Sequence, residues 1–120
     1  MTKIYMTLMV GAILVLPANA LCADASDKAR VDRGRDIAEK ICWPCHVVGA
    51  GERFSPILRE PGPDFRAIAA KSGTSAESLT TFLHSTHRTE GKPYAMPSPR
   101  LTDEMIDQVV GYILSLRQQP

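Results

Sequence analysis

The chain has 120 residues, of which 44% are hydrophobic and 22% charged, and its formal net charge is +1. Acidic and basic residues alternate without a basic block or stripe, which excludes the electrostatic footprint of a protein that binds nucleic acid or an anionic membrane surface. A single domain with one small core is expected, and domains of this size often need a metal, disulfide bonds or a cofactor for stability.

The N-terminus has the charged, apolar and small-residue order of a secretory signal. The apolar run, residues 4–16, is short for a membrane span, and small residues follow it. We predict that residues 1–25 are a signal peptide, cleaved after Ala20 or Ala25, and that residues 26–120 form the domain. The mature protein is expected in the periplasm, without stable membrane insertion.

Two alternatives concern the same N-terminal segment. An uncleaved helix could anchor the protein, although its apolar run is short. If Cys22 survives cleavage it is an unpaired exported thiol, and a lipid anchor on it is conceivable. Asn19 argues against that anchor, because it stands where a lipoprotein signal usually has Leu.

Apolar and small residues at helical spacing predict a first helix over residues 27–41, with one narrow buried face. The residues of this face are Val31, Gly34, Ile37, Ala38 and Ile41.

The motif Cys42-Trp43-Pro44-Cys45-His46 follows directly. Two thiols separated by two residues and followed at once by His are the attachment signature of c-type haem. A single helical turn places both sulfurs where they can bond the two vinyl groups on one edge of the porphyrin, and it brings the next imidazole under the iron. We predict that Cys42 and Cys45 hold one covalent haem c and that His46 binds its iron.

Three other interpretations of the motif remain open. A thioredoxin-like redox pair would start a helix after a strand, whereas this pair ends a helix. A zinc site could recruit Cys42 and Cys45 with His84 and His87, although these histidines are remote for a compact finger. A structural disulfide between the two cysteines would close an unusually tight ring.

Residues 46–63 contain glycines and prolines and are predicted to form a long loop, which in a compact domain is usually functional. Residues 65–71 could form two turns of helix, closed by Gly73. Thr74, with Glu77 three residues later, resembles a capping box and predicts a further helix. The apolar residues of that helix are Leu79, Phe82 and Leu83.

Three prolines predict that residues 84–101 are a loop. Within it, Met96 is our prediction for the second iron ligand, because a restricted backbone before proline can preset a ligand loop. A His/Met pair marks an electron-transfer haem, whereas an open sixth position permits ligand binding or catalysis. The alternative ligands are Met105, which also suits a filler role in the last helix, and His84 or His87 if the loop folds inward.

A last helix is predicted to begin at Thr102, because Thr is a good N-cap and two acidic residues follow it, and Arg117 suits its end. Its predicted buried stripe consists of Ile106, Val109, Val110, Ile113 and Leu116. No strand alternation of useful length occurs, so the predicted fold class is all-α with long loops.

Residues 33–116 resemble the class I cytochrome c family. Gly34 stands eight residues before Cys42, as in the family's first helix. The last helix is similar to the family's at Val109, Tyr112 and Ile113, the stripe that crosses the first helix. The resemblance implies a cytochrome c fold, with three to four helices and long loops around one haem. The crossing, which Gly34 would allow to be close, would be the structural nucleus.

The segment Gly62-Pro63-Asp64-Phe65 resembles the family's Gly-Pro-x-Leu segment. The resemblance implies that the Pro63 carbonyl accepts a hydrogen bond from His46 and orients the ring for iron. The alternative is that Pro63 is only a turn residue. The resemblance further implies that Leu101 and the apolar residues of the third helix form the wall of the haem site.

Two features depart from the family's pattern. The ring of lysines around the exposed haem edge is not evident, because Lys40, Lys71 and Lys92 are scattered among acidic residues, which argues against a strongly charge-steered partner. Trp43 is bulky for its position, and it could pack against the haem edge or mark a docking surface.

Together the motif, the export signal and Met96 predict a periplasmic electron carrier that is not an enzyme. Its expected partners are redox proteins such as a dehydrogenase, an oxidase or a membrane cytochrome complex, and it would be a monomer or a subunit of a complex. Two alternatives stay open. The chain could be the cytochrome subunit of a periplasmic dehydrogenase, or a haem enzyme or gas sensor if Met96 is not a ligand.

Overall fold

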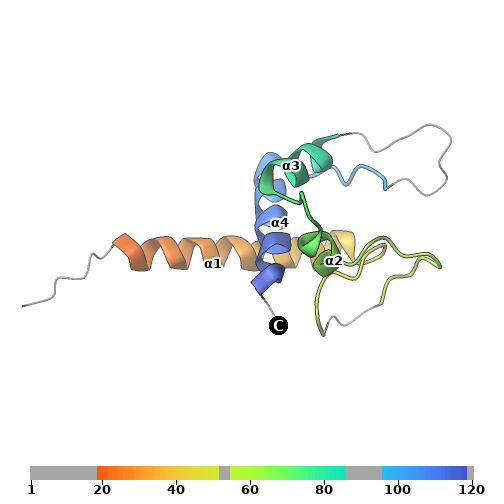
Figure 1. The fold of residues 1–120 in the computed structure, drawn as a ribbon, viewed down its shortest axis with the longest axis horizontal. Helices are drawn as coiled ribbons and strands as arrows, with labels where there is room; N and C mark the ends of the chain where they lie inside the picture. Colours follow the sequence, from red (N-terminus) through yellow and green to blue (C-terminus); the bar gives the residue numbers. More distant parts are fainter. Residues whose placement is uncertain (1–18, 52–54, 86–95, 119–120) are drawn as a thin grey trace, which may run out of the picture.

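A computed structural model of the chain describes residues 19–51, 55–85 and 96–118. Within these ranges the fold consists of helices and contains no strand, which confirms the all-α prediction. The α-helices are α1 (Asn19–Ile37), α2 (Phe65–Ala70), α3 (Ala76–His84) and α4 (Asp103–Ser115) (Figure 1). In the same part of the chain, no helix has both the length and the apolar character needed to cross a membrane.

The first helix differs from its prediction at both ends. It begins at Asn19, so the predicted start at residue 27 is wrong, because the alanine-rich segment before that residue consists of helix-compatible residues and lacks a breaker. Figure 1 shows this part of α1 extending away from the other helices. At the other end, α1 continues into a π-helical turn, η1 (Ala38–Cys42), in which the Trp43 N–H donates to the Ala38 carbonyl at 3.1 Å. Such wider turns often occur at functional sites.

Helix α4 crosses α1 at Gly34 (Figure 1). A Cβ added to Gly34 would lie 1.9 Å from the Gln108 carbonyl oxygen and 2.9 Å from the Tyr112 Cβ. The two backbones can approach this closely because Gly34 has no side chain. The predicted stripe of α4 is confirmed as buried: Ile106, Val109, Val110, Ile113 and Leu116, the last in the 3-10 turn η2 (Leu116–Gln118).

The predicted capping box at Thr74 and Glu77 is wrong by one residue. The Ser75 hydroxyl accepts from the Ser78 N–H at 3.1 Å, and the Ser78 hydroxyl accepts from the Ser75 N–H at 2.8 Å, so Ser75 is the N-cap of α3. The Thr74 hydroxyl instead donates to the Ile68 carbonyl at 2.8 Å, near the end of α2. A hydroxyl residue at each of two successive positions made the choice ambiguous in sequence.

The side chain of Arg117 joins the end of α4 to the connection between α2 and α3. Its Nε donates to the Ala69 carbonyl at 2.6 Å, and a terminal nitrogen donates to the Thr74 carbonyl. Gly73 lies within this connection at a left-handed φ of 84°, which favours glycine. Helices α2 and α3 are therefore held in place relative to α4.

We predict that Gly34→Ala lowers the free energy of unfolding by about 3 kcal/mol, because the added methyl group forces the crossing helices apart. Chemical denaturation followed by circular dichroism measures the change. Arg33→Ala, at an exposed neighbouring position, is the matched control and should stay within about 0.5 kcal/mol of wild type. Equal stability of the Gly34 variant and the control would contradict the crossing.

Candidate functional site

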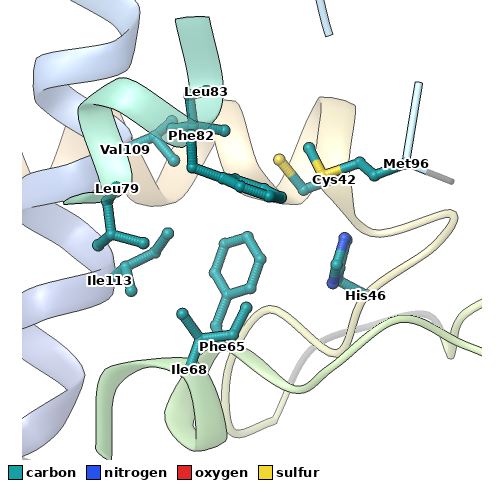
Figure 2. Close-up of a pocket in the computed structure, with 10 residues that line it drawn as sticks. All are labelled: Cys42, His46, Phe65, Ile68, Leu79, Phe82, Leu83, Met96, Val109 and Ile113. Carbon is teal, nitrogen blue, oxygen red and sulfur yellow. The ribbon is translucent and has the colours of Figure 1, made fainter. Parts of the chain in front are cut away.

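A partly open cavity of about 40 Å³ lies between the helices and the cysteine motif (Figure 2). One end is lined by apolar side chains: Phe65 and Ile68 from α2, Leu79, Phe82 and Leu83 from α3, and Val109 and Ile113 from α4. The other end carries Cys42, His46 and Met96. Leu101 packs against the core and is absent from this lining. The apolar lining suits an apolar group that presents a metal near His46.

The imidazole of His46 is buried and has a fixed orientation. Its Nδ1 lies 2.8 Å from the Pro63 carbonyl oxygen, and because a carbonyl can only accept, Nδ1 carries the proton and donates. In the neutral imidazole with its proton on Nδ1, Nε2 carries the lone pair that can bind a metal. The Phe65 ring packs beside the imidazole, with centroids 5.5 Å apart. A Cβ on Gly62 would lie 2.5 Å from the imidazole Cε1, so glycine is needed there.

The two cysteines lie on one turn of backbone. The Cys42 carbonyl accepts from the N–H groups of Cys45 at 3.1 Å and His46 at 2.9 Å. Both thiols are free, so the disulfide interpretation does not apply. Burial raises the pKa of the Cys42 thiol to about 11, and the neighbouring Cys45 adds to the effect. A thiol that is protonated at neutral pH is unlike a thioredoxin-type nucleophile, whose pKa is lowered.

The backbone carbonyls in and after the motif accept hydrogen bonds from N–H groups later in the chain. The Pro44 carbonyl accepts from the Ile57 N–H at 3.0 Å, and the Cys45 carbonyl accepts from the Gly62 N–H at 2.6 Å. One residue beyond His46, the Val47 carbonyl accepts from the Phe65 N–H at 3.0 Å. The loop after the motif and the start of α2 are thus hydrogen-bonded to the backbone on both sides of His46.

Met96 lies at the same end of the cavity as His46 (Figure 2). It is half-buried, and its side chain reaches the lining together with Cys42. Among the side chains that line the cavity, the imidazole of His46, the thioether of Met96 and the thiol of Cys42 carry atoms that can bind a metal.

The alternative ligands are placed less favourably. Met105 lies in the first turn of α4 and is absent from the cavity lining. His84 is exposed at the end of α3, with its Nε2 3.9 Å from an Asp103 carboxylate oxygen, and His87 lies outside the described residues. The part of the chain that the structure describes holds no cluster of three or more His, Cys, Asp or Glu side chains that could bind a metal ion.

Sequence reasoning did not select Ile68, Val109 or Ile113 as lining residues of the site. Ile68 lies three residues after Phe65, so both are on one face of α2. That spacing was a usable signal for Ile68, whereas Val109 and Ile113 were assigned only to the packing of α4.

Comparison with known proteins gives a consistent result. The family model described as cytochrome c matches residues 31–117 of the chain. A cytochrome c-552 from Bradyrhizobium diazoefficiens is 31% identical over 109 residues, which cover 91% of this chain and 90% of that protein. No solved structure matches the chain.

We predict that Gly62→Ala displaces the His46 ring from the Pro63 carbonyl, because the new methyl group would overlap the imidazole. The proton on Nδ1 should then exchange with solvent about tenfold faster, as the loss of a hydrogen bond worth about 1.4 kcal/mol implies. Nitrogen-15 NMR of the reduced protein measures the rate. Pro61→Ala, at an exposed position nearby, should leave it unchanged, and an unchanged rate in the Gly62 variant would contradict the contact.

Proposed function

Because this chain belongs to the cytochrome c family, whose members are electron-transfer proteins with covalently bound haem c and iron, we propose that it is a periplasmic electron carrier whose iron is bound by His46 and Met96. The observation that supports this most directly is the shared end of one apolar cavity, where His46 offers Nε2 and Met96 offers its thioether. The all-α fold is that of the family.

The residues at the cavity fit haem c. Its walls are apolar, as a porphyrin face requires, and the free thiol of Cys42 lines it. The second free thiol, that of Cys45, lies one turn further along the backbone. Cys42 and Cys45 would hold the group through their sulfurs, and His46 would bind the iron from the segment that follows. Covalent attachment lets a small domain keep a large cofactor without relying on burial alone.

The chemistry that haem c supplies here is a one-electron change in iron valence. The chain's own residues set the conditions for that change. The Pro63 carbonyl orients His46 and raises the basicity of its Nε2, which favours ferric iron. Met96 favours ferrous iron, and the apolar walls keep water from the site. No proton transfer or catalytic group is required, and the partners are redox proteins.

We predict that Met96→Ala abolishes the red charge-transfer band of Met-ligated ferric haem and permits rapid binding of carbon monoxide to the reduced protein. The ratio of reduced to oxidised protein at a fixed poise should fall about tenfold or more, equivalent to about 59 mV for one electron. Absorption spectroscopy measures the band in the ferric protein, the ratio during a redox titration, and carbon monoxide binding after the gas is added to the reduced protein.

Met105→Ala is the matched control, because it removes a thioether from α4 that does not line the cavity. It should retain the band and remain inert to carbon monoxide. Loss of the band in the Met105 variant, with retention in the Met96 variant, would overturn the ligand assignment and leave haem attachment intact.

The proposed location rests on the N-terminal sequence, which has the order of a secretory signal. We predict that protein purified from the periplasm begins at Leu21 or Ser26, because cleavage follows Ala20 or Ala25. Intact mass spectrometry of the holoprotein gives the start directly. A mass that includes residues 1–20 would contradict the proposed cleavage.

A further inference from the structure

The hydroxyl of Tyr112 reaches from α4 to the segment that carries His46. It donates to the Val48 carbonyl at 2.8 Å, two residues beyond the imidazole. Both partners are buried, with Tyr112 only 4% and Val48 only 1% exposed. A buried hydrogen bond between a helix and a loop 64 residues away in sequence restrains the loop more than an exposed one would, because water cannot replace the donor.

Two glycines, Gly49 and Gly34, allow the backbone to approach the Tyr112 side chain closely. A Cβ at Gly49 would lie 2.6 Å from the Tyr112 hydroxyl oxygen, and a Cβ at Gly34 would lie 2.9 Å from the Tyr112 Cβ. One end of the side chain is therefore set by the crossing of α1 and α4, and the other end touches the loop beside Val48. Tyr112 connects the helix crossing to the backbone that follows His46.

We propose that Tyr112 is a positioning residue for His46, acting through the Val48 carbonyl. The inference rests on the proposed function, in which His46 binds the iron. By holding Val48, the Tyr112 hydroxyl keeps the backbone at residues 46–48 in the conformation that directs the imidazole to the Pro63 carbonyl. Its effect on the iron is indirect, through the strength of the hydrogen bond at Nδ1.

The Val48 carbonyl differs from its neighbours in accepting its hydrogen bond from a side chain, that of Tyr112. The Cys45 carbonyl accepts from the backbone N–H of Gly62, in the loop after the motif, and the Val47 carbonyl accepts from that of Phe65, the first residue of α2. Val48 is held from α4, the helix that also contributes Val109 and Ile113 to the cavity. The tyrosine thus fixes His46 relative to the cavity wall as well as to its own loop.

Tyr112→Phe tests the proposal, because it removes the hydroxyl and keeps the ring that packs at the crossing. Relaxation of the loop weakens the His46 hydrogen bond, lowers imidazole basicity and so destabilises ferric iron. At a fixed poise, the ratio of reduced to oxidised holoprotein should rise about threefold, less than the tenfold or more expected for a group that contacts a metal ligand directly. The His46 ring signals in NMR spectra should shift as well.

Gly49→Ala is a second route to the same change from the loop side. Its methyl group would displace the Tyr112 hydroxyl, and the ratio should rise in the same direction. In the Tyr112→Phe background the oxygen is absent and the next ring atom lies 4.0 Å from the methyl position, so Gly49→Ala should add little. This double-mutant cycle isolates the hydroxyl contact, and Gly49→Ala decides the question if the Tyr112 variant does not fold.

Val110→Ala controls for stability, because Val110 is buried on α4 but lies outside the cavity lining. It should lower the free energy of unfolding without changing the redox ratio. A wild-type ratio and unshifted His46 signals in both Tyr112→Phe and Gly49→Ala would overturn the proposal and leave Tyr112 a packing residue. Failure of the proposed function would instead appear in the wild-type protein, as the absence of a one-electron transition.

Discussion

The close approach of α1 and α4 at Gly34 is the constraint on which the rest of the structure depends. A side chain there would overlap the backbone of α4 at Gln108, so the crossing exists because that position has none. The crossing fixes the direction of α4, which supplies part of the cavity wall. Arg117, in the η2 turn that follows α4, is hydrogen-bonded to the Ala69 and Thr74 carbonyls. The hydroxyl of Tyr112, on α4, donates to the Val48 carbonyl and so connects the crossing to the loop after His46.

The functional site is a polar backbone network beside an apolar cavity. The network uses its hydrogen bonds to fix one imidazole, and the cavity provides a low-polarity environment. Under the proposed ligation by His46, small changes at that imidazole would affect iron strongly. This division suits a small domain of the cytochrome c family, whose members are electron-transfer proteins. The protein needs to hold and tune haem c, and the cofactor supplies the change in valence.

Prediction from sequence succeeded where one strong local signal existed. The stripe of α4 from Ile106 to Leu116 has clear helical spacing, and its burial is confirmed. Prediction failed where local signals competed or were missing. Successive hydroxyl residues offered two caps for α3, and the structure uses Ser75. The start of α1 had no marker, because Asn19 precedes residues that all tolerate a helix. The π-helical turn η1, which ends at Cys42, also had no marker in the apolar spacing.

The sequence by itself indicated the cofactor, because adjacent residues carry the signal: the spacing of Cys42, Cys45 and His46 predicts covalent haem c, and the family match shows that cofactor. Only the tertiary structure decided which distant groups surround the imidazole. The approach of Gly62 to the ring and the hydrogen bond from Tyr112 to Val48 join segments far apart in sequence. Such contacts depend on how the helices cross, and no local pattern of residue types encodes that geometry.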